Sequence, residues 1–253
     1  MKRVIFIAVM CAFVAAPAVA DPSYGTVQVK YRNYTDSPVL YRETTVYDSI
    51  HMGTAVGRVV TGIYRLDMQT YVDNGGNPLN LSADEIAMLS GKVDSFCTDI
   101  IDNPDKSNFR TYNVSPLEEI PDPVAGPMGD AKAIDAAELL YMNWTSSLDA
   151  AQAAAIQAAL WEIVNEDSGT YALGQGAAFG NFQMWGNSSV VSAANLLLGN
   201  LTPDAQQVDY RGYFVGLTSP SYQDFVVKVP LPGAVLLGIL GLGVAGLKLR
   251  KFA

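Results

Sequence analysis

The first half of the chain alternates apolar and polar residues over several short stretches. Around residue 29 the alternating set is Val27, Gln28, Val29, Lys30, Tyr31 and Arg32. A period of two is typical of a strand that buries one face. It predicts strands within residues 25–47 and 56–72, and near 93–101 and 110–114. The remainder of residues 103–129 is rich in Pro, Asp and Gly, which predicts a long loop.

The pattern becomes helical after residue 131. Residues 131–164 are rich in Ala, Leu and Met, and the sequence 143–147 predicts a break between two helices. In the second helix, one face carries the apolar residues Ile156, Leu160, Ile163 and Val164 at helical spacing. A further helix is expected over 189–198, because Gly199 is a typical helix stop.

The remaining segments mix both types. A capping-box spacing predicts a short helix over 82–89, and strand patterns occupy 181–185 and 207–229. The expected fold class is therefore α+β, with strands that form a barrel or sandwich and a helical insertion.

The chain opens with the pattern of a secretion signal. The basic flank Met1-Lys2-Arg3 precedes an apolar run, 4–16, and a small-x-small site, Ala18-Val19-Ala20. The run is too short for a comfortable bilayer span, so we expect residues 1–20 to be a signal peptide. The alternatives are an uncleaved anchor or a buried first strand, and the basic flank argues against the strand.

The chain closes with an apolar segment and a basic end. No residue from Leu231 to Leu247 is charged or strongly polar, and Lys248, Arg250 and Lys251 follow at once. As a helix the segment is about 26 Å long, near the minimum for a membrane span. We therefore predict one C-terminal transmembrane helix that holds the basic end in the cytoplasm and the body outside. A buried core helix is the alternative.

The motif before this segment reads Val229-Pro230-Leu231-Pro232-Gly233. With the apolar segment and the basic end, residues 229–253 resemble the PEP-CTERM class of bacterial sorting signals, which carry Val-Pro-Glu-Pro or a close variant. Leu231 stands where Glu is usual. The resemblance implies a sorting protease of the exosortase type, which cuts near the motif and passes the protein to the cell surface or extracellular matrix.

The body between the two ends, residues 21–228, is long enough for one large domain with a sizeable core. The chain has 16 basic and 25 acidic residues, a formal charge of −9. Five basic residues and no acidic ones lie in the two ends, so the body alone is near −14. This charge argues against nucleic-acid binding and favours basic or amine-rich partners.

Few residues suit metal or hydrolytic chemistry. His51 is the single histidine, which argues against a zinc site and leaves one base for any catalytic triad. A loop histidine is the simpler interpretation. The stretch 73–78 has too few oxygen ligands for a calcium loop and predicts a turn. There is no phosphate-binding glycine loop or dinucleotide fingerprint. We expect no metal and no cofactor, and a hydrolase is a distant third interpretation because no paired carboxylates stand out among the 25 acidic residues.

Cleavage of the signal removes Cys11 and leaves Cys97 as the one cysteine of an exported protein. An odd cysteine in an oxidising compartment requires an explanation. It is a buried thiol that acts as a small hydrophobe, half of an intermolecular disulfide, or one end of an acyl link.

Two segments bear on that choice: Phe96-Cys97-Thr98-Asp99 and Ile156-Gln157-Ala158-Ala159-Leu160-Trp161. They resemble the thioester domains of bacterial surface adhesins, in which a cysteine on a strand bonds to the glutamine of a Thr-Gln-x-Ala-hydrophobic-Trp motif. Ile156 stands where Thr is usual. The resemblance implies that Cys97 is the thiol and Gln157 the acyl partner, in a thioester-like extracellular domain over 21–228. It places four residues in support: Phe96, Thr98, Ala159 and Trp161.

The chemistry needs no histidine or metal. The Cys97 thiolate attacks the side-chain carbonyl of Gln157 and ammonia leaves. Because an amide is a poor electrophile, the step requires enforced proximity and polarising donors. The thioester then acylates an amine on a surface protein or polymer, in a single turnover rather than as an enzyme. The sequence thus predicts an adhesion or matrix protein that captures its partner covalently. The alternative is a non-covalent structural or carbohydrate-binding matrix protein with an inert Cys97.

Overall fold

The computed structural model describes residues 24–32, 41–48, 54–73, 90–100, 102–121, 126–203 and 206–229. The strands are β1 (Gly25–Arg32), β2 (Tyr41–Asp48), β3 (Thr54–Gly62), β4 (Tyr64–Asp73), β5 (Gly91–Cys97), β6 (Arg110–Ser115), β7 (Phe182–Trp185), β8 (Phe214–Thr218) and β9 (Phe225–Lys228). The helices are α2 (Gly129–Asn143), α3 (Ala150–Asn165) and α4 (Ser188–Gly199), with 3-10 turns at Leu117–Glu119, Ala177–Phe179 and Arg211–Tyr213.

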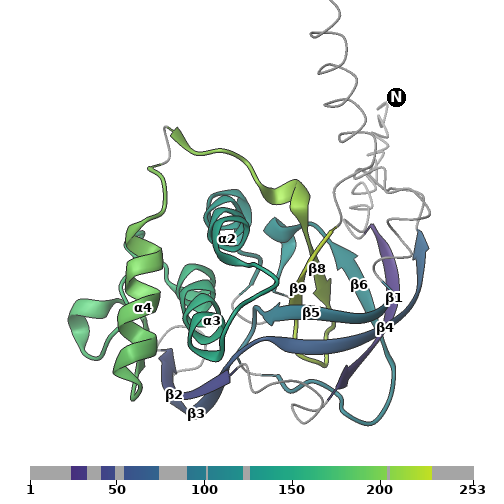
Figure 1. Ribbon diagram of the computed structural model, residues 1–253, viewed down its shortest axis with the longest axis horizontal. Helices are drawn as coiled ribbons and strands as arrows, with labels where there is room; N and C mark the ends of the chain where they lie inside the picture. Colours follow the sequence, from purple (N-terminus) through teal and green to yellow (C-terminus); the bar gives the residue numbers. More distant parts are fainter. Residues whose placement is uncertain are drawn as a thin grey trace, which may run out of the picture.

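Six antiparallel strands close into a barrel in the order β1-β4-β5-β9-β8-β6 (Figure 1). Alternation along β1 turns Val27, Val29 and Tyr31 inward, where each is 2 % exposed. Leu66 and Met68 of the neighbouring β4 are buried in the same way. The α+β prediction is confirmed, and of the two expected architectures the barrel is the one that forms.

A second, three-stranded sheet has the order β3-β2-β7. The sequence pattern ran without interruption over 56–72, yet the chain changes sheet at Ile63, between β3 and β4. Because both strands alternate with the same period, the pattern alone does not mark where one sheet ends and the next begins.

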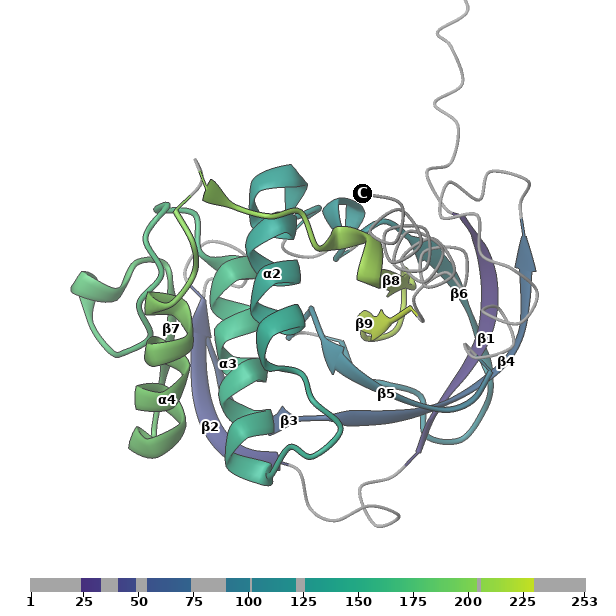
Figure 2. The ribbon, with the colours of Figure 1, turned by 45° about the horizontal axis from the view of Figure 1, so that its top comes forward.

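The helix α3 is the centre of the helical layer. It packs against α2, α4 and the strands β2 and β3, and every residue from Ala153 to Asn165 is buried. Its first turn is fixed by a capping box between Asp149 and Gln152. The predicted break over 143–147 is confirmed. The C-terminal end of β5 points at this layer (Figure 2), and that meeting point is where Cys97 and Gln157 lie.

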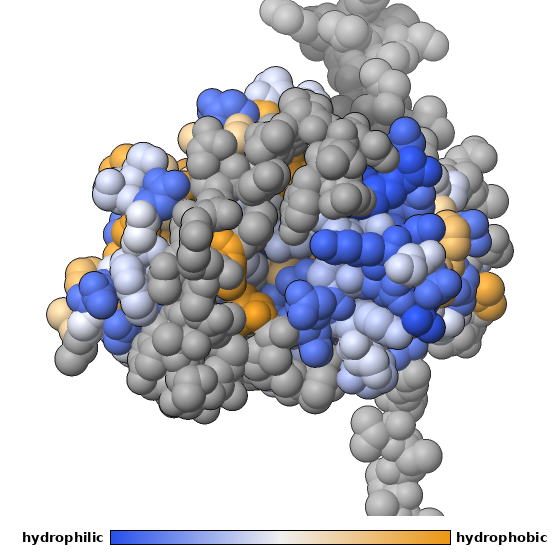
Figure 3. All heavy atoms as spheres, turned by 90° about the horizontal axis from the view of Figure 1, so that it is seen from below, coloured by the Kyte–Doolittle hydropathy of each residue, from blue (hydrophilic) through white to orange (hydrophobic). Residues whose placement is uncertain are grey.

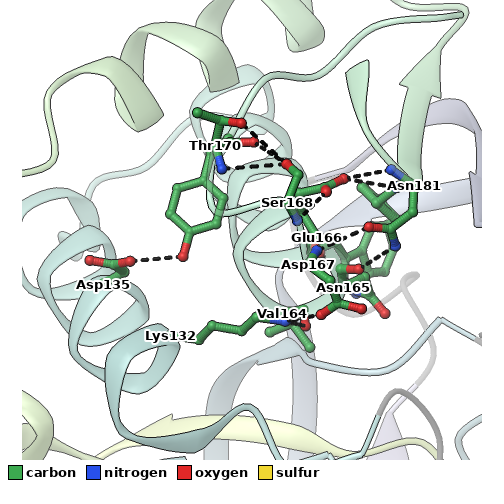
Figure 4. Close-up of polar contacts among 12 residues, drawn as sticks. Lys132, Asp135, Val164, Asn165, Glu166, Asp167, Ser168, Thr170 and Asn181 are labelled. Carbon is green, nitrogen blue, oxygen red and sulfur yellow. Dashed lines mark hydrogen bonds and ion pairs between the residues drawn. The ribbon is translucent and has the colours of Figure 1, made fainter. Parts of the chain in front are cut away.

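The loop that follows α3 is held by one buried carboxylate, Glu166 (Figure 4). It accepts hydrogen bonds from three main-chain N–H groups: Ser168 at 2.7 Å, Asn181 at 2.9 Å and Phe182 at 3.0 Å. The same residue therefore anchors both the end of α3 and the start of β7, and it ties the helical layer to the second sheet.

Polar side chains gather over the barrel side of the face shown in Figure 3. The outward positions of β1, β4 and β5 carry ion pairs, Arg32 with Asp67 and Arg65 with Asp94. Within the described ranges no helix has the length and apolar character to cross a membrane. The predicted transmembrane segment, the signal peptide, the helix over 82–89, the turn after Asp73 and His51 all lie outside the described residues.

Candidate functional site

Cys97 is the last residue of β5 and is fully buried. On one side β5 pairs with β9, where the Thr98 N–H donates to the Asp224 carbonyl at 3.0 Å. On the other side the pairing with β4 ends at Ser95. Since successive residues of a strand direct their main-chain groups to opposite edges, the N–H and C=O of Cys97 face the edge that β4 has left open.

The side chain of Gln157 fills that open edge. Its Oε1 accepts from the Cys97 N–H at 2.9 Å, and its Nε2 donates to the Cys97 carbonyl at 2.7 Å. Gln157 is fully buried near the middle of α3. The carboxamide thus replaces a neighbouring strand and is fixed in orientation against the residue that bears the thiol.

The sulfur of Cys97 has its own polar surroundings. The thiol donates to the main-chain oxygen of Asp99. The side-chain Nε2 of Gln223, from the loop between β8 and β9, donates to the sulfur at 2.7 Å and to the Asp99 oxygen at 3.2 Å. The sulfur is therefore held between the end of β5 and the β8–β9 loop.

Burial raises the pKa of the Cys97 thiol well above its ordinary range. The carboxylates of Asp99 and Asp224 add to the rise, because negative charge nearby disfavours a thiolate. The Trp161 indole N–H makes no hydrogen bond to the sulfur, but as a nearby donor it acts on the pKa in the opposite direction. The resting group is the protonated thiol, so any attack by the sulfur involves transfer of its proton as the new bond forms.

The supporting residues named from the sequence are all buried. Phe96 packs edge-on against Trp144, with ring centroids 4.8 Å apart. Ala159 and Thr98 are fully enclosed, and Trp161 is 1 % exposed. The Thr98 hydroxyl has no hydrogen-bond partner among the described residues. Apolar packing on the helix side thus excludes water from Cys97 and Gln157.

The β8–β9 loop closes the other side of the site. Asp224 accepts from the Ser219 N–H at 2.8 Å, and its own N–H donates to the Asp99 carboxylate at 2.6 Å. The Tyr112 hydroxyl donates to the Gln223 carbonyl at 3.2 Å. This loop and α3 together leave Cys97 and Gln157 without exposure to solvent.

Gln223, Asp224 and the carboxylate contacts of Asp99 were not identified as site residues from the sequence. Gln223 and Asp224 stand directly before the apolar run 225–227. A polar pair at the start of a strand is ordinary, and only the pairing of β5 with β9 brings it to Cys97. Their burial is what marks them as unusual, and burial cannot be read from the sequence.

The predicted sorting motif is only partly described. Val229 is 5 % exposed, and its N–H donates to the Tyr213 carbonyl at 2.8 Å. Residues 230–233 and the basic residues Lys248, Arg250 and Lys251 lie outside the described residues. In the part of the chain that is described, no group of three His, Cys, Asp or Glu side chains is arranged to hold a metal ion.

Comparisons of the chain with models of known protein families, with curated proteins and with solved structures gave no match. The chemistry of the site is therefore argued from its own geometry.

Proposed function

We propose that this chain is an exported surface or matrix protein in which Cys97 and Gln157 form an internal thioester for covalent attachment to amines. The observation that carries the proposal is the double hydrogen bond between the Gln157 carboxamide and the main chain of Cys97. It supports the proposal because the Gln157 carboxamide is held, buried and fixed in orientation, against the residue that bears the thiol, and such proximity raises the effective concentration of two groups.

The same contacts supply a chemical route. As the sulfur attacks the side-chain carbon of Gln157, charge develops on Oε1, and the Cys97 N–H already points at that atom. The C–S bond forms, the C–N bond breaks, and the thiol proton leaves with the amide nitrogen as ammonia. The Cys97 carbonyl accepts from the departing nitrogen in the starting state. No co-reactant is needed.

The thioester is then opened by an amine of a partner. The amine nitrogen bonds to the acyl carbon of residue 157, the C–S bond breaks, and the amine proton passes to the sulfur. The products are a stable amide and a free Cys97 thiol. Each chain reacts once, so the protein is a single-use acylating agent and not an enzyme.

Intact-mass spectrometry of the exported protein tests the proposal. We expect a mass about 17 Da below that of the processed chain, the mass of the ammonia that leaves when the acyl bond forms. Cys97→Ala and Gln157→Ala should each restore the full mass. Gln206→Ala is the matched control, because Gln206 is an exposed glutamine outside the site, and it should retain the loss. A full mass in the unaltered protein, with Cys97 open to alkylation after unfolding, would instead identify the inert-cysteine alternative.

The proposal includes delivery by the two ends of the chain. The signal-like residues 1–20 and the PEP-CTERM-like residues 229–253 support export, transient anchoring and transfer by an exosortase-type protease. Deletion of residues 231–247 should move the protein from the envelope fraction to the medium. Retention of that variant in the envelope would contradict the anchoring role.

A further inference from the structure

Gln223 contributes the one side chain of the β8–β9 loop that hydrogen-bonds to the sulfur. Its Nε2 lies 2.7 Å from the Cys97 sulfur, and the residue is 5 % exposed. Its Oε1 is buried and accepts no hydrogen bond from any residue in the described ranges. A buried amide that leaves one of its polar atoms unpaired costs stability, so packing alone does not account for its position beside the sulfur.

Several contacts hold Gln223 where it is. Its carbonyl accepts from Tyr112, and the next residue, Asp224, is tied through its N–H to the Asp99 carboxylate. On the other side, the Tyr222 ring lies under the Arg110 guanidinium, whose carbon is 5.0 Å from the ring centroid. The loop is thus built to fix the carboxamide against the sulfur.

We propose, on the basis of the thioester function above, that Gln223 is a catalytic residue of the site whose Nε2–H stabilises negative charge on the Cys97 sulfur. Charge appears there twice: when the sulfur attacks Gln157, and when it departs from the thioester under attack by an amine. Among the described residues, Gln223 is the one whose side chain has a hydrogen bond to the sulfur, because the buried Trp161 N–H makes none. The free Oε1 offers an acceptor to the N–H groups of the incoming amine, which favours primary amines over nucleophiles that lack them.

The experiment compares the full chain with Gln223→Met, which keeps the volume of the side chain and removes both polar atoms. We expect the rate of ammonia loss in this variant to be about tenfold lower, which is the effect of one hydrogen bond to a charged atom. The rate is measured from the intact mass at successive times after synthesis. Opening of the thioester by methylamine should slow by a similar factor. Gln206→Ala, an exposed glutamine outside the site, is the matched control and should react at the unaltered rate.

A second readout separates the chemical role from a structural one. In a Gln157→Ala background Cys97 remains a thiol, and the pH dependence of its alkylation by iodoacetamide reports its ionisation. Adding Gln223→Met should move that dependence to higher pH. A residue that only supported the fold would leave it in place. Gln223→Glu, which replaces the donor by a charge, should shift it further in the same direction.

The outcomes distinguish the two proposals. A full mass in the unaltered chain removes the thioester and the role of Gln223 together. If Gln223→Met loses ammonia completely, and both ammonia loss and opening by methylamine proceed at the unaltered rates, the role of Gln223 is overturned and the thioester stands. Ammonia loss that survives Gln157→Ala and disappears in Gln223→Met would identify Gln223 itself as the acyl partner, and it would overturn both assignments as stated.

Discussion

At the residue scale, the site combines one glutamine that is fully hydrogen-bonded with several buried polar atoms that are not. Gln157 satisfies both halves of its amide on the main chain of Cys97. By contrast, the Thr98 hydroxyl and the Trp161 indole N–H have no partner among the described residues. Since a buried polar group without a partner costs stability, these atoms indicate a region shaped by something other than packing alone.

Glu162 provides a test of stability at this scale. It lies beside Trp161 on α3, and burial followed by the charge of Glu166 raises its pKa from 4.5 to about 8. Between pH 4.5 and about 8 the unfolded chain has released this proton and the folded chain has kept it. The folded state therefore loses stability as pH rises, by up to about 1.4 kcal/mol per pH unit.

Glu162→Gln should remove this dependence and make the variant more stable than the unaltered protein at pH 9. Urea unfolding from pH 5 to 9 measures it, with Glu119→Gln on the partly exposed turn 117–119 as the control. Parallel stability curves for Glu162→Gln and the unaltered protein would show that Glu162 is ionised in the folded state.

At the element scale, periodicity in the sequence located most helices and strands but not their assembly. The two helices on either side of the 143–147 break were predicted, because Ala-rich spacing and a polar interruption are local features. The change of sheet at Ile63 and the end of β5 at Cys97 were not, because both depend on which strand lies alongside. The same holds for Gln223, which reaches Cys97 only through the pairing of β5 with β9.

The N-terminal cap of α3 gives a prediction for an element. The Asp149 side chain accepts from the N–H groups of Ala151 at 2.7 Å and Gln152 at 2.9 Å. Asp149→Ala should destabilise the protein by about 1 kcal/mol, and Asp149→Asn, an equivalent cap, by much less. Because Gln157 lies about two turns further along the helix, ammonia loss should persist in both variants. Loss of the thioester in Asp149→Ala would mean that the whole helix, not its first turn, depends on the cap.

Glu166 gives a second prediction for the connection between α3 and β7. The Glu166 carboxylate accepts from three main-chain N–H groups, whereas Glu166→Gln turns an NH₂ donor toward at least one of these donors. We therefore expect the free energy of unfolding to fall by about 2–4 kcal/mol. Asp167→Asn is the neighbouring control. Asp167 pairs with Lys132 at 2.8 Å and is 45 % exposed, so its loss should cost less than about 1 kcal/mol. Equal unfolding midpoints for the two variants would remove the anchoring role of Glu166.

At the scale of the whole molecule, the fold separates an enclosed candidate site from a strongly charged exterior. Cys97 and Gln157 are fully enclosed where the barrel meets the helical layer, while ion pairs such as Arg65 with Asp94 lie on the outside of the barrel. Under the proposed function, enclosure would protect the thioester from water, and a partner would first associate with the surface and then gain entry. Association is governed by the charge of the body, which is near −14 for residues 21–228.

This charge predicts which amines react fastest. Around an acidic body, a lysine within a basic peptide should be concentrated near the surface, and the same lysine within an acidic peptide should be repelled. We expect the basic peptide to open the thioester several-fold faster at low salt. The difference should shrink as ionic strength rises, because the Debye length falls from about 30 Å at 0.01 M to about 3 Å at 1 M.

Rates of thioester opening, measured by intact mass over that range of salt, test the prediction, with methylamine as a small reference nucleophile. Since methylamine has one charge and no extended surface, its rate should change little with salt. Peptides that react at equal rates at every salt concentration would show that entry past the β8–β9 loop, and not long-range attraction, selects the partner.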